Sequence, residues 1–302
     1  MATRLLFIHA MTPLHAGTGQ AVGGIDLPIA RERPTGIPLV PGSSIKGALR
    51  ARDTSDLATV IFGPPTEAAS DGSGAVQIAD AHLVLLPVRS LAGTFAWVTS
   101  PYLLSRFARD AKEASLEVPV PPRVPRENAC LVLGNKLQAR LGNLDKVVLE
   151  DLDFLPVAEP SAELASIVRT LGECLFPGGG ASEIAARQSL ADRICLIHDD
   201  TIAYLLESAT EVMARIRLDD EKKTVAKGAL WYEEALPAES ILVGLALASR
   251  VRRAGTTHEA SALLSALARN AGAGLVQLGG KATVGRGLCR LQFAASSQAG
   301  AR

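Results

Sequence analysis

The order of extended and helical segments is the feature that most constrains the fold of this 302-residue chain. Runs of bulky apolar residues, typical of strands, and segments that open on helix-capping residues follow one another without strict alternation. Strict alternation would predict a doubly wound parallel sheet, whereas this order favours an α+β fold with an antiparallel sheet. The expected strands are 4–11, 75–90, 94–100, 146–157, 194–198, 212–218, 225–236, 241–249, 274–278 and 287–293, and the expected helices are 43–52, 102–114, 161–175, 199–209 and 259–271.

Turn-forming residues divide these elements. Short polar turns at 90–93 and 219–223 predict two β-hairpins, the second between the strands 212–218 and 225–236. Prolines between 119 and 125 exclude regular helix there and predict a loop or linker. Gly178, Gly179 and Gly180 predict a flexible joint.

The distribution of charge indicates a polyanionic partner although the net charge is zero. Residues 1–52 carry six basic against two acidic residues, and residues 250–302 carry eight basic against one acidic residue. A fold that brings the two ends together would concentrate positive charge on one surface, as polyanion-binding proteins do. The alternative is that these charges scatter over a solvated surface.

Cysteine usage and hydropathy bear on the compartment. The four cysteines are scattered without metal-ligand spacing, which indicates buried thiols in a reducing compartment, and we therefore expect a cytoplasmic protein. No apolar run approaches the ~20 residues that span a bilayer, so we expect no membrane partner.

The first glycine-containing motif is Thr12-Pro13-Leu14-His15-Ala16-Gly17-Thr18-Gly19. Glycines let backbone N–H groups approach a ligand closely, but the segment continues through Gly23 to Pro28 without the helix that a dinucleotide site requires. By itself the motif is more typical of a tight connection than of a ligand site.

The second motif, Pro41-Gly42-Ser43-Ser44-Ile45-Lys46-Gly47-Ala48-Leu49-Arg50, predicts a helix start with Ser43 or Ser44 as its N-cap. A helix N-terminus suits an anion, and Lys46 and Arg50, one turn apart, would both reach a phosphate there. Ser43-x-x-Lys46 also matches the nucleophile motif of serine acyl-transferases, but their Ser-Asp-Asn and Lys-Thr-Gly elements do not occur in the chain. The remaining alternative is a capped helix with solvated basic residues.

The third motif is the glycine loop, residues 279–287, Gly-Gly-Lys-Ala-Thr-Val-Gly-Arg-Gly, with a predicted strand on either side. It lacks the residue order of a P-loop and no helix follows it. The composition suits a backbone nest that contacts phosphates, with Lys281 and Arg286 adding sequence-independent attraction. The alternative is a simple hairpin turn.

These three motifs together resemble the RAMP superfamily of CRISPR proteins. A longer match, over 24–32 and 229–237, resembles the backbone subunit of the type III-B (Cmr) effector complex. The resemblance covers both ends of the chain and the hairpin near 225, and is less specific over about 62–200.

The resemblance implies one domain, 1–302, with a modified ferredoxin-like (RRM-like) palm and a thumb hairpin. Residues 11–42 would form an active-site loop, 62–200 inserted helical and loop segments with part of the palm, 210–238 the thumb, and 274–295 the last strands with the glycine loop. Copies of the chain would stack into a filament along a CRISPR guide RNA, beside other Cmr subunits.

The resemblance also implies which residues contact the guide RNA. Those on its path would be Ser43, Ser44, Lys46, Arg50, Gly279, Gly280, Lys281, Gly285, Arg286 and Gly287. Arg215 and Arg217, placed on one face of the first thumb strand by period-two spacing, would steady the RNA where the thumb wedges between bases. Trp231 and Tyr232 point to opposite faces, so at most one of them stacks on a base and the other packs.

Cleavage of complementary target RNA is the activity that the resemblance implies, with Asp26 as the catalytic residue. One carboxylate can hold a divalent ion, Mg²⁺ or Mn²⁺, against a phosphate, or orient a 2′-hydroxyl for attack. His15 is a secondary candidate for general acid or base, and Glu233 or Glu234 for assistance across a subunit boundary. The alternative is a purely structural RNA-binding subunit without catalysis.

Overall fold

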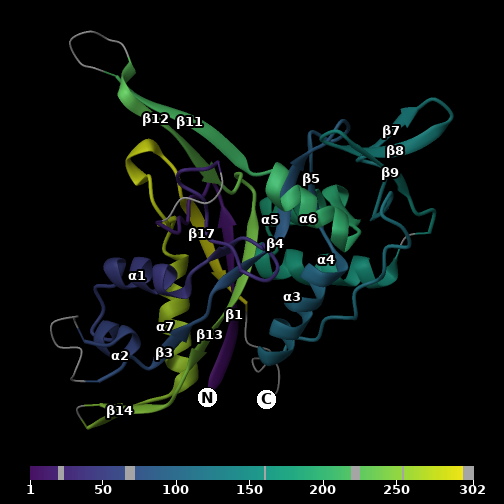
Figure 1. The fold of residues 1–302 in the computed structure, drawn as a ribbon. Helices are drawn as coiled ribbons and strands as arrows, with labels where there is room; N and C mark the ends of the chain where they lie inside the picture. Colours follow the sequence, from purple (N-terminus) through teal and green to yellow (C-terminus); the bar gives the residue numbers. More distant parts are fainter. Residues whose placement is uncertain (20–23, 65–71, 160, 219–224, 254, 295–302) are drawn as a thin grey trace.

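The elements of the computed structural model lie in the order expected from the sequence (Figure 1). It describes residues 1–19, 24–64, 72–159, 161–218, 225–253 and 255–294; the predicted turn 219–223 lies outside them. The strands are β1 Ala2–Ala10, β2 Leu39–Val40, β3 Val76–Ile78, β4 Ala81–Arg89, β5 Phe95–Thr99, β6 Ala129–Val132, β7 Gln138–Leu141, β8 Leu144–Leu149, β9 Leu152–Pro156, β10 Ile194–Ile197, β11 Glu211–Leu218, β12 Val225–Ala235, β13 Ile241–Ala248, β14 Val251–Arg253, β15 Thr256–His258, β16 Val276–Gln277 and β17 Leu288–Phe293. The helices are α1 Gly42–Arg52, α2 Ala58–Phe62, α3 Pro101–Glu113, α4 Ala162–Leu175, α5 Ala181–Arg193, α6 Asp199–Ser208 and α7 Ala260–Gly272, and a short 3₁₀ helix covers Ala282–Val284.

One large sheet forms the palm and joins the two ends of the chain. Its path runs β16-β17-β1-β13-β4-β5-β10-β6-β9-β8-β7, with β2 beside β4 and β3 beside β13. The first strand, β1, lies between β13 and the last strand, β17, and is antiparallel to both. The two ends of the chain therefore lie side by side in the palm. This meets the condition under which their basic residues could share one surface.

Strand β1 divides the core because its side chains alternate between the two faces of the sheet. Leu6 and Ile8 belong to the cluster that contains the buried leucines of α7, whereas Leu5 and Phe7 belong to the cluster that contains most of the buried residues of α3 and α4. Helix α4 follows directly from its sequence, since Ser161 accepts a hydrogen bond from the Leu164 N–H at 3.1 Å. The palm is thus a sheet covered by helices on both faces.

Several expectations about the elements were wrong: the strand expected over 75–90 is two strands, β3 and β4, and α2, β6, β7, β14 and β15 were not predicted. Residues 146–157 form a hairpin, β8 and β9, because Glu150 turns the chain with a φ of 49°. Helix α5 was not predicted; it begins directly after Gly180, and Leu190 is its one fully buried residue, so it presents no apolar stripe to recognise. The sheet is mixed, since β10 pairs with β5 and β6 with β9 in parallel, although the strands around β1 are antiparallel as predicted.

The thumb is a separate two-stranded sheet of β11 and β12 that projects from the palm (Figure 1). Its register pairs Val212 with Glu234 at the base and Ile216 with Leu230 farther out. The predicted hairpin is therefore present, and its base lies against the loops that carry the predicted site.

Candidate functional site

Residues 12–16 connect the thumb base to the glycine loop. Leu14 and Leu236 exchange backbone hydrogen bonds of 2.8 and 2.9 Å at the end of β12. On the other side, the Gly280 N–H donates to the His15 carbonyl and the Gly287 N–H to the Pro13 carbonyl, each at 2.9 Å. Three segments far apart in sequence therefore meet at one place.

The glycine loop uses its backbone for packing within the protein. It joins the antiparallel pair β16 and β17, as the hairpin alternative required. The N–H groups of Gly280, Val284, Gly285, Arg286 and Gly287 all donate to protein carbonyls. Gly279 has a φ of 69°, and a Cβ there would lie 2.2 Å from the His15 carbonyl oxygen. These five N–H groups are thus committed within the protein.

Both cations of the loop turn toward the thumb base. The Lys281 Nζ lies 2.8 Å from Glu233 Oε1, and the Arg286 guanidinium, almost wholly buried, contacts the Met213 sulfur at 2.9 Å. The loop and the thumb are therefore joined through side chains as well as through residues 12–16.

Glu233 is a buried carboxylate surrounded by donors. Besides Lys281, the Trp231 indole N–H donates to Oε1 at 2.7 Å and the Arg215 guanidinium to Oε2 at 3.3 Å. Burial raises the pKa of Glu233, but the hydrogen bonds from Lys281 and Trp231 outweigh it and hold the pKa below its ordinary value. Glu233 is therefore ionised at neutral pH and offsets part of the positive charge of the two cations beside it.

Glu234 serves the opposite face of β12. Its Oε2 accepts from the Ile29 backbone N–H at 3.0 Å, and its Oε1 accepts from Arg31 at 2.5 Å and from the Thr210 hydroxyl at 3.0 Å. All four oxygens of Glu233 and Glu234 thus accept hydrogen bonds within the subunit. The predicted assistance across a subunit boundary stays a prediction, since it concerns a contact with another copy.

His15 is buried among the glycines that surround it. Its Nδ1 lies 2.6 Å from the Glu234 carbonyl oxygen, and because a carbonyl only accepts, Nδ1 carries the proton. A Cβ on Gly17 would lie 2.7 Å from the His15 Nε2. The side chain therefore holds residues 12–17 against the thumb base.

Asp26 is the exposed carboxylate of the site. Its Oδ2 accepts from the Tyr232 backbone N–H at 2.8 Å, while its Oδ1 has no partner among the residues that the structure describes. Leu27, the next residue, exchanges backbone hydrogen bonds with Tyr232 and Glu234. The segment around Asp26 is thus fixed along the edge of β12 that faces away from β11, and within the described ranges the Oδ1 of Asp26 is open to a ligand.

The predicted thumb residues lie on different surfaces. Arg215 pairs with Glu233, whereas Arg217 is exposed and sits where the pairing of β11 and β12 shifts register, so period-two spacing does not fix its face. Trp231 is half-buried against Glu233, and Tyr232 is exposed. Of the two aromatic residues, Tyr232 is therefore the one available for stacking.

The start of α1 differs from its prediction. The helix begins at Gly42, one residue before the expected serine cap, because the Asp80 carboxylate accepts from the Gly42 N–H at 2.8 Å. Ser43 and Ser44 are exposed and make no cap hydrogen bond. The predicted anion seat is therefore partly filled by a carboxylate of the chain itself.

The two cations of α1 turn inward. Lys46 donates to the Val76 carbonyl at 2.9 Å, and burial lowers its pKa, with the charge of Arg50 adding to the effect. Arg50 donates to the Pro64 carbonyl at 2.7 Å. The sequence predicted that both cations reach a phosphate at the helix N-terminus. In the structure, both donate to backbone carbonyls of the protein instead.

A divalent ion would find a single protein carboxylate here. Within the described ranges, no group of three or more His, Cys, Asp or Glu side chains could hold a metal. Mg²⁺ is commonly held by one or two carboxylates together with phosphate oxygens of the substrate. Asp26 therefore fits an ion that binds with the RNA, and does not fit a preformed protein cage.

Arg31 is a site residue that the sequence did not single out for a role. It joins Glu234 to the Gly36 and Leu206 carbonyls, at 2.9 Å each, and so ties the Asp26 segment to α6. The sequence offered one signal that could have identified Arg31, namely its position five residues after Asp26 in a loop with few other cations.

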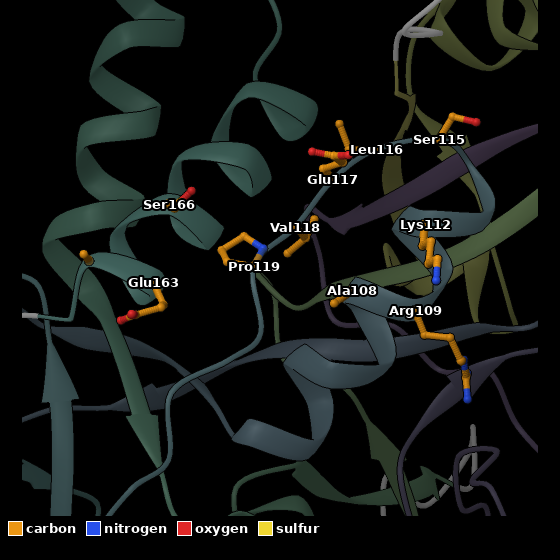
Figure 2. Close-up of a pocket in the computed structure, with 11 residues that line it drawn as sticks. Ala108, Arg109, Lys112, Ser115, Leu116, Glu117, Val118, Pro119, Glu163 and Ser166 are labelled. Carbon is orange, nitrogen blue, oxygen red and sulfur yellow. The ribbon is translucent and has the colours of Figure 1, made fainter.

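A separate hollow lies on another side of the molecule. It has a volume of about 1130 Å³ and lies between α3, the following loop and the start of α4 (Figure 2). Arg109 and Lys112 line one wall and Glu163 the other. It contains none of the predicted site residues.

No helix in the part of the chain described here is long and apolar enough to cross a membrane.

Sequence comparison identifies the class to which this fold and site belong. The pattern of the RAMP superfamily matches residues 7–290, so the chain belongs to the RAMP superfamily. A Pyrococcus furiosus protein named CRISPR system Cmr endoribonuclease Cmr4 is 32% identical over 297 residues, 96% of this chain and 95% of that protein. A Saccharolobus solfataricus protein named CRISPR system CMR subunit Cmr4 is 24% identical over 306 residues, 95% of each chain.

Solved structures confirm the predicted fold class. Oligomeric Cmr4 from Pyrococcus furiosus matches with a TM-score of 0.72 at 28% identity, over 97% of this chain and 98% of that one. The type III-B Cmr-beta complex bound to cognate target RNA contains a chain that matches with a TM-score of 0.71 at 21% identity, over 97% of each chain. The resemblance drawn from the three motifs is therefore confirmed.

Proposed function

We propose that the chain is a backbone subunit of a type III-B CRISPR ribonucleoprotein that binds guide RNA and cleaves complementary target RNA at Asp26. The observation that carries the proposal is the position of Asp26, an exposed carboxylate fixed beside the thumb base while the neighbouring carboxylates are occupied. The full-length match to a protein named an endoribonuclease supports the reaction class.

The residues around Asp26 have different roles in the proposed reaction. The Tyr232 N–H orients the carboxylate through Oδ2, and Oδ1 is the atom that would hold a divalent ion with a phosphate of the target. When bound, Mg²⁺ or Mn²⁺ would neutralise charge that develops on that phosphate. His15, Arg31 and Glu234 keep the Asp26 segment against the thumb, so we assign them positioning roles.

The guide RNA would follow the side of the glycine loop. There Lys281 and Arg215 are partly exposed, and Arg217 lies farther along β11. These residues suit backbone contacts, and base pairing with the guide would supply sequence specificity. The other proposed partners are further copies of the chain and the other Cmr subunits, in the cytoplasm.

The test is Asp26→Asn in the complex assembled with guide RNA. Cleavage of a complementary target should fall by at least about 100-fold, the usual contribution of a positioned catalytic group, while target affinity stays unchanged. Asp56→Asn, the same change at an exposed aspartate of another surface, is the matched control. Unchanged cleavage would remove Asp26 from the mechanism.

The products and the metal requirement distinguish the chemistry. Metal-assisted cleavage should stop in EDTA and return with Mg²⁺ or Mn²⁺. Cleavage that continues in EDTA and leaves 2′,3′-cyclic phosphate ends would instead place Asp26 on the attacking 2′-hydroxyl.

A further inference from the structure

Strand β12 is one of the two connections between the thumb and the palm. It returns to the palm through residues 236–240, a tight turn in which the Ser240 N–H and hydroxyl both donate to the Pro237 carbonyl, at 3.3 and 2.8 Å. Strand β13 follows directly and pairs with β1. This turn therefore sets the direction in which β12 leaves the palm.

Glu239, within this turn, has a backbone conformation that residues with side chains rarely adopt. Its φ is 73°, in the left-handed region that favours glycine. Such a conformation costs free energy, and it persists only where surrounding contacts hold it. A glutamate at this position therefore needs contacts that offset the cost.

Three hydrogen bonds hold Glu239 to two strands of the palm. Its backbone N–H donates to the Ala10 carbonyl at 2.7 Å, and its own carbonyl accepts from the Trp97 indole N–H at 2.8 Å. Its carboxylate accepts from the His9 Nε2 at 2.8 Å. Only the bond to His9 requires the glutamate side chain. We call His9, Trp97 and Glu239 the thumb clasp.

Packing alone does not account for the histidine of the thumb clasp. His9 is 7% exposed, and its ring meets the Phe176 ring edge-on, with centroids 6.0 Å apart. Its Nδ1 is buried and has no hydrogen-bond partner among the residues that the structure describes. A buried polar atom without a partner costs free energy, so stability by itself would favour an apolar residue here. The contact with Glu239 is what distinguishes His9 from an ordinary core residue.

The direction of β12 matters because this strand carries Asp26. The Asp26 carboxylate accepts from the Tyr232 N–H, and Leu27 exchanges backbone hydrogen bonds with Tyr232 and Glu234. The Asp26 segment therefore moves with β12. A misplacement of about 1 Å can cost a reaction roughly 100-fold in rate, even when its cause lies far from the chemistry.

We propose that Glu239 is a positioning residue for target cleavage. Held by His9 and Trp97, it fixes the direction of β12 and so places Asp26 against the target phosphate. The proposal rests on the proposed function, because it concerns the placement of the residue that function makes catalytic.

The first test measures target cleavage in a single turnover, at saturating target, by the complex assembled with guide RNA. Glycine adopts the φ of Glu239 without strain, so Glu239→Gly removes the carboxylate and keeps the backbone. The cleavage rate should fall at least about 10-fold, while target affinity stays unchanged because base pairing supplies it. Glu239→Gln still offers an oxygen to His9 and should cleave within about twofold of the wild-type rate.

Glu150→Gly is the matched control. Glu150 is also a glutamate of positive φ, 49°, but it lies in the turn between β8 and β9. This variant should cleave at the wild-type rate. A Glu239→Gly variant that cleaves like the wild type overturns the proposal. So does one that loses target affinity in proportion to its rate, because that is the result of a merely structural role.

The second test needs no cleavage. The four native cysteines are buried, so spin labels can be attached selectively to the double variant Leu91→Cys/Leu230→Cys, whose exposed positions lie after β4 and on the thumb. In labelled chains diluted with unlabelled protein, the distribution of distances between the labels should broaden with Glu239→Gly and stay narrow with Glu239→Gln or Glu150→Gly. A distribution that Glu239→Gly leaves unchanged overturns the proposal. Broadening in a protein whose complex never cuts RNA would reject the proposed function and still support the hold of the thumb clasp on β12.

Discussion

The glycine loop and the start of α1 differ in how their cations are placed, although both sequences predicted a phosphate-binding site. Each offered glycines and two cations to a phosphate, yet Lys46 and Arg50 of α1 turn inward to backbone carbonyls. Lys281 instead remains partly exposed beside Glu233, at the centre of the site. A cation in a glycine-rich sequence therefore marks a binding surface only where the fold leaves its charge near solvent, and that depends on residues distant in sequence.

The two segments are also anchored by carboxylates of different burial, and this predicts a difference in stability. Glu233→Ala removes a buried carboxylate that accepts hydrogen bonds from two partly exposed cations, Lys281 and Arg215, and should lower the free energy of unfolding by about 2 kcal/mol. Asp80→Ala removes the exposed carboxylate at the start of α1 and should cost only about 1 kcal/mol. Urea denaturation of both variants measures the difference. Equal decreases in the free energy of unfolding would show that Glu233 does not hold the glycine loop to the thumb base.

The pH dependence of the same variant sharpens this prediction. The pKa of Glu233 is lowered on folding, so its contribution is present above the ordinary value of 4.5 and is lost as pH falls through the folded value. The stability difference between wild type and Glu233→Gln should therefore shrink below about pH 4.5. A difference that grows on acidification would contradict the network around Glu233.

Glycine substitutions should act in opposite directions in the two segments. Gly279→Ala places a Cβ against the His15 carbonyl at a residue with a φ of 69°, and should lower the free energy of unfolding by about 3 kcal/mol. Gly47→Ala has open space within α1 and should raise it by about 1 kcal/mol, because alanine favours helix. Thermal unfolding of both variants tests the sign, and a neutral Gly279→Ala would show that residues 12–16 and the loop can separate.

Local patterns accounted for most elements, and long-range contacts account for the errors. The thumb strands and α4 could be predicted because their apolar periods and caps lie within the segments themselves. The roles of Glu233 and Glu234 could not, since their partners lie in residues 29–31 and 281, far away in sequence. The same reason explains the cap of α1, which depends on Asp80. Asp26 came from the family resemblance, because a lone aspartate in a glycine-rich loop is ordinarily a turn residue.

RNA affinity offers the last comparison between the two segments. Lys281→Met removes a partly exposed cation beside the proposed guide path and should weaken guide-RNA binding by about 10-fold near physiological salt, with a salt dependence reduced by about one ion. Lys46→Met removes a cation that already donates to the Val76 carbonyl, so the affinity should change by less than about twofold. Filter binding over a salt series measures both. Because Lys281 also neutralises Glu233, Lys281→Arg should restore binding if charge is what matters. Equal effects of Lys46→Met and Lys281→Met would mean that α1 lines the RNA path after all, and that Lys46 exchanges its carbonyl for a phosphate when RNA binds.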